Sequence, residues 1–373
     1  MGPGRRTGST GSGVDAMNMA FKPKPLSVRI LERPEANELA RIDAFVSASA
    51  QGTAFHRPAW VLAVSRACGH QWRYLLAEDG TGELQGILPL NLIHSALFGR
   101  ALVSSGFAVG GGILSDNDQA IQLLADKAWE FAERYSFPSV ELRGGPVPDG
   151  QWHHKQGIYA GFVNPLADDD ESQLLAIPRK QRAEIRKGLA NDLTVRVGVG
   201  EQDRADHYAV YAESVRNLGT PVFPKALFDE VLDEFGEDAD ILTVLHDGKP
   251  VASVLSLYHQ QTVMPYWGGG TWDARRFRAN DIMYYSLMNH ARKRGCNKFD
   301  FGRSKYGTGA FSFKKNWGFE PQPLSYATRT ADGEEARDVN PLSPKYKAKI
   351  ALWQRLPLPV ANLIGPMIAK GLG

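Results

Sequence analysis

The sequence predicts an α/β protein built from two tandem units, each a mixed β-sheet flanked by helices. Three observations lead to this prediction. The chain has 373 residues, which corresponds to two or three domains at about 150 residues each. Its 43% hydrophobic and 23% charged residues are ordinary for a protein with a buried core. A pattern of strands, a glycine-rich bend, a helix and a further strand occurs twice, roughly 160 residues apart.

The first copy of the pattern occupies residues 72–143. Turn residues separate its first two strands, and a glycine-rich stretch at 106–112 separates its third strand from a helix. Asp118 is the expected cap of that helix, and Pro138 ends it. The strands of this copy are expected at 72–77, 83–90, 101–104 and 140–143.

The second copy repeats this order in residues 240–301. Asp247 and Gly248 form a strong hairpin signal between its first two strands. The third strand runs into glycines at 268–270, and a helix follows at about 280–294 with Gly295 directly beyond it. The strands of this copy are expected at 240–246, 250–258, 262–267 and 298–301.

Two helices are expected before each copy, where they would pack across the sheet. They are placed at 35–49, 58–67, 203–216 and 225–235. The predicted domains are a disordered leader at 1–24, a first unit at 25–150, a second unit with the main site at 151–332 and a C-terminal docking segment at 333–373. Met17 or Met19 is an alternative start within the leader.

Composition and charge exclude several classes of protein. Lys and Arg number 43 against 41 Asp and Glu, so no basic field indicates binding to DNA. Two cysteines cannot form a disulfide framework or a structural zinc site, and no metal is expected. No apolar stretch approaches the roughly 18 residues of a membrane span. A cytoplasmic protein is therefore expected.

Two local segments resemble the Fem transferases, tandem GNAT-like proteins that attach amino acids to peptidoglycan precursors. Residues 182–188 follow the arginine-rich pattern of that family: Arg, two residues, Ile, Arg, Lys and a small residue. The run Phe-Asp-Phe-Gly at 299–302, followed by Phe-Lys-Lys-Asn-Trp-Gly at 313–318, is similar to a second family pattern. This resemblance implies two tandem GNAT (acyl-CoA N-acyltransferase-like) domains and a transferase activity.

Three further tracts resemble one subfamily, the FemAB-related proteins associated with PEP-CTERM/exosortase systems in exopolysaccharide-making bacteria. They are residues 216–224, 301–311 and 356–366. This resemblance implies an envelope or exopolysaccharide precursor as acceptor. The chain lacks the long helical hairpin of Fem enzymes that use aminoacyl-tRNA, and residues 273–280 lack the glycines that hold CoA pyrophosphate in many GNAT domains. The donor therefore stays open between acyl-CoA and aminoacyl-tRNA.

The first candidate site is a basic helix expected to begin near Pro178. Arg179, Arg182 and Arg186 would share one face of it, at spacings of three and four residues. Guanidinium groups bind phosphate or carboxylate through two parallel hydrogen bonds. The alternative is a solvated basic face that is paired with Glu184.

The second candidate site is the segment 300–315, directly after a predicted strand. Ligands of open α/β sheets bind beyond strand ends. Arg303 and Lys305 supply positive charge there, and Lys314 is the predicted catalytic residue because a lysine can stabilise an oxyanion. Asp300 is the candidate general base, or alternatively a structural carboxylate that accepts backbone amides. The tracts of the subfamily add Tyr306 and Arg216 as substrate-binding residues.

Three functions remain open from the sequence. The first is a Fem-type acyl- or aminoacyl-transferase acting on a phosphate-bearing envelope or exopolysaccharide precursor. The others are a CoA-dependent GNAT N-acetyltransferase and a catalytically silent double-GNAT binding module. Residues 345–373 are too apolar for a free tail, and five cationic side chains accompany them. This segment is expected to dock on the protein's own domains or, alternatively, on the inner face of the membrane.

Overall fold

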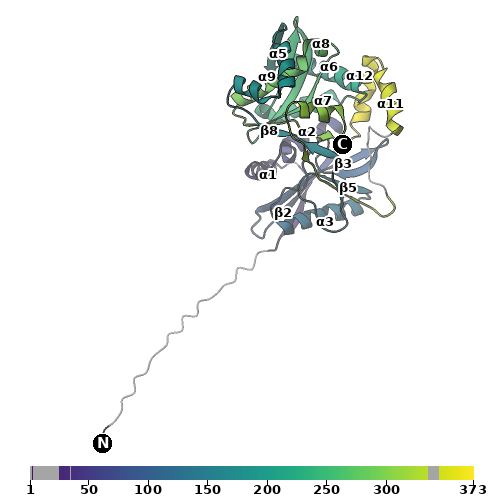
Figure 1. The fold of residues 1–373 in the computed structure, drawn as a ribbon. Coiled ribbons are helices and arrows are strands. Elements are labelled where there is room, and N and C mark those ends of the chain that lie inside the picture. Colours follow the sequence, from purple (N-terminus) through teal and green to yellow (C-terminus); the bar gives the residue numbers. More distant parts are fainter. Residues whose placement is uncertain (1, 3–24, 34, 335–343) are drawn as a thin grey trace.

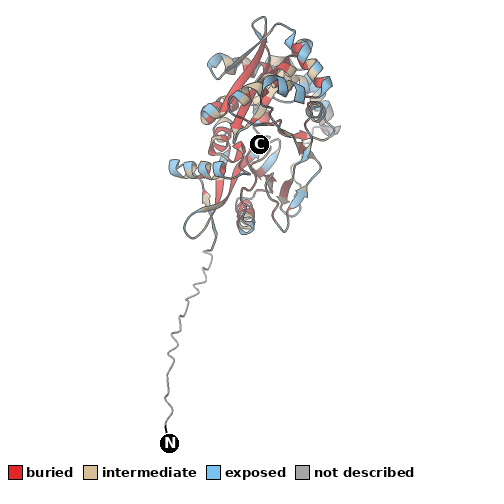
Figure 2. Cartoon of the chain, turned by 60° about the vertical axis from the view of Figure 1, so that its left-hand side comes forward, coloured by how far each residue is buried: buried red, intermediate tan, exposed pale blue. Residues whose placement is uncertain are grey.

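The computed structural model describes residue 2 and residues 25–33, 35–334 and 344–373; the rest of the predicted leader lies outside the described residues. Two large sheets form the centres of two units that lie one above the other (Figure 1). The sheet strands are largely buried, and the outer faces of the helices are exposed (Figure 2). The predicted α/β class with two mixed sheets flanked by helices is confirmed.

The first unit is built on a seven-stranded mixed sheet. Three helices and a short 3₁₀ turn accompany its strands: α1 (Ala36–Ala48), η1 (Ala54–His56), α2 (Pro58–Cys68) and α3 (Asp118–Arg134). The strand order is β1 (Ser27–Leu31), β2 (Gln71–Glu78), β3 (Leu84–Ser95), β4 (Gly99–Val103), β5 (Ser139–Arg143), β16 (Tyr326–Thr330) and β6 (His153–Lys155).

The predicted cap of α3 is wrong by one residue. The Asn117 side chain accepts a hydrogen bond from the backbone N–H of Ala120, so Asn117 is the N-cap and Asp118 is the first helical residue. Both residue types favour this position, and only the backbone conformation decides between neighbours. Leu124 and Ala128 of α3 are fully buried against the sheet.

The second unit repeats this order on a six-stranded mixed sheet. Asp247 and Gly248 form the predicted tight turn, and both have positive φ, as a two-residue hairpin requires. The strand order is β8 (Val163–Pro165), β13 (Lys298–Asp300), β12 (Thr262–Gly270), β11 (Lys249–His259), β10 (Ala239–His246) and β9 (Leu193–Gly198). Its helical segments are α4 (Asp170–Ala176), α5 (Arg179–Leu189), α6 (Glu201–Leu218), α7 (Lys225–Phe235), η2 (Gly236–Asp238), α8 (Ala274–Phe277), α9 (Ala279–Lys293) and α10 (Gly309–Asn316).

The second half of the chain contributes a strand to the sheet of the first unit. Strand β16 follows the second copy of the repeat in the chain, yet it pairs with β5 and β6 in the sheet of the first unit. In a small third sheet, β7 (Tyr159–Gly161) pairs with β14 (Ser304–Lys305) and β15 (Gln322–Pro323). The sheet of the first unit is therefore completed by a strand from the second half of the chain, whereas the strands of the six-stranded sheet all lie within residues 163–300.

A shared aromatic core joins the units along α2 and α7. Trp60 of α2 stacks on Trp267 of β12 with ring centroids 5.6 Å apart, and Phe228 of α7 contacts the same Trp267 ring at 4.8 Å. The indole N–H of Trp60 donates to the carbonyl oxygen of Gly106 at 3.0 Å. This places the glycine-rich stretch of the first unit against the sheet of the second.

The C-terminal segment forms two helices, α11 (Pro344–Gln354) and α12 (Leu358–Ala369), and both pack on α6. The chain breaks at Pro357, which precedes α12, as expected for a proline. Pro366 lies inside α12 without ending it. Within the described part of the chain, no helix combines the length and apolar character that crossing a membrane requires.

Gly112→Ala should destabilise the protein, because a Cβ at residue 112 would overlap the carbonyl oxygen of Gly144, a backbone atom that cannot move alone. Overpacking of this kind typically costs about 1–3 kcal/mol. Gly110→Ala is the matched control, since its Cβ would meet only the Phe55 ring at 3.8 Å. Urea unfolding of both variants tests this, and equal free energies of unfolding would contradict it.

Candidate functional site

The candidate site lies where β12 and β13 part. These parallel strands pair only at Thr262 with Lys298 and at Val263 with Phe299. Strand β12 continues to Gly270, whereas β13 ends at Asp300 and the chain turns away. Ends of parallel strands that separate in this way are where open α/β sheets bind ligands.

Asp300 is held at the end of β13 by the local backbone. Gly302 has φ of 66°, and its N–H donates to Oδ1 of Asp300 at 2.7 Å. Burial raises the pKa of Asp300 to about 6, although the Gly302 amide and the nearby Lys314 ammonium oppose this shift. The side chain is half-buried, so it is reachable while surrounded by protein. Asp300 thus accepts a backbone amide, as the structural alternative expected, and also has a pKa suited to a base near neutral pH.

Lys314 lies on α10, which follows the loop. Thr308 caps this helix by accepting a hydrogen bond from the N–H of Phe311. The Lys314 Nζ donates to the carbonyl oxygens of Gly302 at 3.2 Å and Arg303 at 2.9 Å. Because an ammonium group has three N–H donors, one remains for a further acceptor.

The surroundings of Lys314 set its charge. Nζ lies 5.4 Å from the centre of the Phe162 ring. Burial lowers the pKa of Lys314 to about 8, and the Asp300 carboxylate partly offsets this effect. The neighbouring Lys315 is exposed. The two adjacent lysines therefore occupy different environments, as the choice of Lys314 over Lys315 requires.

Arg303 joins the two units. Its guanidinium donates to the Tyr326 hydroxyl at 2.8 Å and lies 4.5 Å from the centre of the Tyr159 ring. The Tyr326 hydroxyl in turn donates to the carbonyl oxygen of Val109 at 2.8 Å. A second tyrosine, Tyr266 of β12, donates to the carbonyl oxygen of Phe107.

The sequence reasoning missed these three tyrosines, Tyr159, Tyr266 and Tyr326. They come from β7, β12 and β16, and no local motif marks them. The residues joined by the Tyr326–Val109 hydrogen bond are 217 positions apart in the chain. The pairing of β16 with β5 brings them together. The glycine-rich stretch of the first unit thereby becomes a wall beside Arg303.

Lys305 and Tyr306 continue the same loop. Lys305 pairs through its backbone with Tyr159, as part of the small third sheet. The Tyr306 ring packs on Phe311 of α10 with centroids 4.9 Å apart. Both side chains are half-buried. The structure therefore brings Asp300, Arg303, Lys305, Tyr306 and Lys314 into one loop and helix.

The basic helix is α5, and it begins after Pro178 as predicted. Its buried face packs on α9: Gln181 donates to Asp281 at 2.6 Å, and Gly188 lies against Ile282. The opposite face borders a surface depression of about 610 Å³. The residues lining that depression are Arg179, Arg182, Ala183, Arg186, Lys187 and Ala190.

Glu184 does not neutralise these arginines. Its carboxylate pairs with Lys187 at 2.7 Å and with Arg278 at 2.6 Å. Among the residues that the structure describes, no carboxylate pairs with the side chains of Arg179, Arg182 or Arg186. Three guanidiniums on one face are thus left for an anion.

Arg216 lies elsewhere. It is on α6, and its guanidinium donates to the carbonyl oxygen of Gln354 in α11 at 3.2 Å. Its contacts are therefore with the C-terminal segment, and the structure does not join it to the loop or to α5.

The first unit differs from the second at the position that corresponds to Asp300. In its parallel strands, Leu102 of β4 is paired with Val140 of β5 in the core beneath α3. In the second unit, Val263 of β12 is paired with Phe299 of β13 in the core beneath α9. The residue after Val140 is Glu141, which corresponds to Asp300. Its carboxylate is paired with Arg143 at 2.8 Å. The second unit is therefore the one with an acidic group set against a buried lysine.

Residues 273–280, where a glycine-containing CoA-binding loop stands in many GNAT domains, are largely helical. Residues Ala274–Phe277 form α8, and Arg278, with φ of 59°, leads into α9. Exposed Arg275 and Arg276 stand there in place of glycines. Over the described residues, no group of three or more His, Cys, Asp or Glu side chains has the arrangement needed to hold a metal ion.

Comparison with known proteins agrees with this geometry. Residues 179–315 match the family described as "Acetyltransferase (GNAT) domain". FemX is 16% identical, with a TM-score of 0.63 over 80% of this chain and 96% of its own. A tandem GNAT protein from the clavulanic acid biosynthesis pathway is 12% identical, with a TM-score of 0.50 over 83% and 100%.

A third similar structure is the C-terminal domain of a proposed lysylphosphatidylglycerol synthetase from Agrobacterium fabrum. It is 15% identical, with a TM-score of 0.53 over 79% of this chain and 93% of its own. No curated protein matches the sequence significantly. The fold and the matched domain define a protein with the acyltransferase-like GNAT fold. More particularly, the fold is similar to that of FemX and of a tandem GNAT protein.

Asp300→Asn should change how stability depends on pH. Because the folded pKa of about 6 exceeds the ordinary value near 4, the unfolded chain releases this proton first as pH rises. The free energy of unfolding of the wild type therefore falls between pH 4 and 6 through this group, and Asp300→Asn removes that fall. Urea unfolding across this range measures it, with the exposed Asp149→Asn as control. Parallel curves for wild type and Asp300→Asn would refute the assignment.

Proposed function

We propose that the chain is an acyl- or aminoacyl-transferase that acts on a phosphate-bearing precursor of the cell envelope or of an exopolysaccharide. The observation that carries this proposal is the electrostatic influence between Asp300, at the end of β13, and the Lys314 ammonium of α10, beside a GNAT-type sheet. Similarity to FemX and to the lysylphosphatidylglycerol synthetase domain supports a transfer reaction at the envelope. The subfamily resemblance of the sequence extends the acceptor to exopolysaccharide made in PEP-CTERM/exosortase systems.

The chemistry assigns one step to each residue. The acceptor amine or hydroxyl attacks the carbonyl carbon of the donor, and Asp300 takes the proton that the nucleophile loses. Its pKa of about 6 leaves it ionised at neutral pH while still basic enough for this transfer. The remaining N–H of Lys314 donates to the developing oxyanion, which then collapses as the donor's leaving group departs.

The α5 face is the proposed place for the acceptor's phosphate. Arg179, Arg182 and Arg186 present unpaired guanidiniums there, and the helix is anchored to α9 through its opposite face. A fixed helix loses little freedom when an anion binds, which favours affinity.

The donor is proposed to be acyl-CoA or aminoacyl-tRNA, both of which carry phosphate. Arg275 and Arg276 are exposed on α8, just before α9, and are proposed to contact the phosphate of this donor. The reaction is proposed to take place in the cytoplasm, at the inner face of the membrane where envelope precursors are assembled.

The match to an acetyltransferase domain favours a second candidate, a simple CoA-dependent N-acetyltransferase. A thermal-shift panel separates the two, with acetyl-CoA, UDP-linked sugars and UDP-linked muropeptides as ligands. Stabilisation by UDP-linked compounds supports the Fem-type function. Stabilisation by acetyl-CoA alone favours the second candidate, and no response to any of them favours a silent binding module.

Lys314→Met should lower kcat by about 10²–10³, the usual effect of losing one oxyanion donor. Lys315→Met removes the same charge from an exposed position and should have little effect. Transfer to the precursor that the panel identifies is the measurement, and thermal melting of both variants shows whether the loop stays folded. A loss confined to Lys315→Met, or equal small losses in both, would refute the role of Lys314.

Arg182→Ala should raise the acceptor Kd about tenfold or more, since a hydrogen bond to a charged group contributes about 1.5–3 kcal/mol. Lys180→Ala is the matched control: it removes a cation of the same helix that does not border the depression. Titration with a UDP-linked muropeptide measures both. An Arg182→Ala Kd within twofold of the wild type would remove α5 from the acceptor site.

A further inference from the structure

Helix α12 is packed with its small residues inward. Ala361, Gly365 and Ala369, spaced four residues apart, are buried, and Gly365 lies against Val222. The large apolar residues face the other way: Leu363 is 74% exposed and Met367 is 68% exposed. This is the reverse of an ordinary docked helix, in which large apolar side chains point into the protein.

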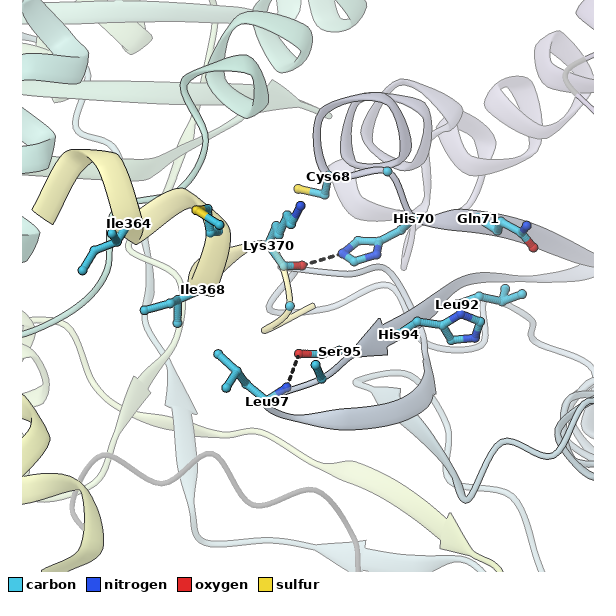
Figure 3. Close-up of a pocket in the computed structure, with 14 residues that line it drawn as sticks. Cys68, His70, Gln71, Leu92, His94, Ser95, Leu97, Ile364, Ile368 and Lys370 are labelled. Atoms are coloured by element: carbon cyan, nitrogen blue, oxygen red, sulfur yellow. Dashed lines mark hydrogen bonds between the residues drawn. The ribbon is translucent and has the colours of Figure 1, made fainter. Parts of the chain in front are cut away.

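A pocket of about 720 Å³ lies between α12 and the β3–β4 hairpin. Ile364 and Ile368 of α12 line one side, and Leu92 and Leu97 of the hairpin region line the other (Figure 3). Leu97 is 68% exposed, so the apolar surface continues from the pocket to its rim. The volume lies within the range of about 300–1,000 Å³ that is usual for ligand sites.

Hydrogen bonds fix the end of α12 beside the pocket. The His70 ring bonds to the carbonyl oxygen of Lys370 at 2.6 Å (Figure 3). The Arg143 guanidinium donates to the carbonyl oxygen of Gly373 at 2.9 Å. These bonds attach the end of the C-terminal segment to the first unit. The pocket is therefore formed before any ligand arrives.

The charge of the C-terminal segment has one sign. Residues 344–373 contain no Asp or Glu, although the whole chain has 41, and α12 itself contains no charged residue. In the sequence, cations precede and follow the apolar helix: Lys345, Lys347, Lys349 and Arg355 come before it and Lys370 after it. Lys370 also lines the pocket. An apolar centre with cationic flanks complements a surface that is apolar inside and anionic outside.

We propose that this pocket binds an acyl chain of an anionic phospholipid and that, together with the exposed face of α12, it seats the protein on an anionic bilayer. The chain enters between Leu97 and Met367 and lies against Ile364 and Ile368, while Lys370 meets the headgroup phosphate. Leu363 and Met367 enter the interfacial region. A bilayer satisfies both the apolar face and its cationic flanks, whereas another protein would need acidic residues around an apolar groove.

The pocket is tested with dihexanoyl phosphatidylglycerol below its micelle concentration, so that no bilayer is present. Ala96→Trp places a large side chain in the pocket from an exposed lining position, and Ala44→Trp makes the same change on the exposed side of α1. Saturable binding by wild type and Ala44→Trp, weakened about tenfold or more in Ala96→Trp, is expected. No saturable binding by the wild type, or equal binding by Ala96→Trp, overturns the pocket assignment.

The surface is tested by co-sedimentation of the full chain with phosphatidylcholine vesicles, with and without phosphatidylglycerol. The double variant Leu363→Asp/Met367→Asp should lose about tenfold or more of its binding to the anionic vesicles. Leu175→Asp, at a 53% exposed leucine of α4, is the matched control and should bind as the wild type does. Binding by the wild type should also weaken as salt is raised.

Three outcomes overturn the bilayer assignment: equal binding by the double variant, equal binding to neutral vesicles, and self-association that the double substitution abolishes without any vesicle binding. The last of these would assign the face to a second copy of the chain. All these readouts are independent of transfer chemistry. Failure here therefore leaves the proposed reaction standing, and failure of the transfer assay leaves the lipid site standing.

Discussion

The structure depends on one strand pairing, in which β16, from the end of the second unit, pairs with β5 of the first. This pairing places the Tyr326 hydroxyl between the Arg303 guanidinium and the Val109 carbonyl oxygen, which links the loop after β13 to the glycine-rich stretch of the first unit. An arginine surrounded by protein is costly without such partners. The same contacts therefore join the two units and fix the position of the loop.

The duplicated fold carries two different chemical environments. In the first unit, Glu141 is paired with Arg143, which also holds the glycine-rich stretch and the C-terminal end. In the second unit, Asp300 lies within the electrostatic influence of the partly buried Lys314, and it accepts one backbone N–H, that of Gly302, among the residues that the structure describes. A carboxylate that is fully paired stabilises a fold, whereas one that is desolvated and incompletely paired is suited to proton transfer. The same position in the repeat has thus become structural in one copy and a candidate for chemistry in the other.

The C-terminal segment contacts both units, and these contacts involve residues that lie outside the candidate site. Arg216 bonds to Gln354, and His70 bonds to the backbone of Lys370. The segment thereby covers the junction of the units with its small residues and leaves its large apolar residues outside. An exposed apolar face of this kind marks an interaction site or favours aggregation.

The sequence by itself determined the order of elements, the internal repeat and the shared face of the α5 arginines, because these depend on periodicity and turn residues within a few positions of one another. It also singled out Lys314 and Asp300 within one segment, residues 300–315. Local pattern cannot choose between adjacent capping residues, and so it placed the α3 cap at Asp118 instead of Asn117. Only the tertiary structure decided the pairing of β16 with β5, the tyrosines around Arg303 and the outward face of α12. Each of these depends on contacts between segments that are distant in the chain. Such contacts form only when long loops close, and patterns within a few residues do not reveal them.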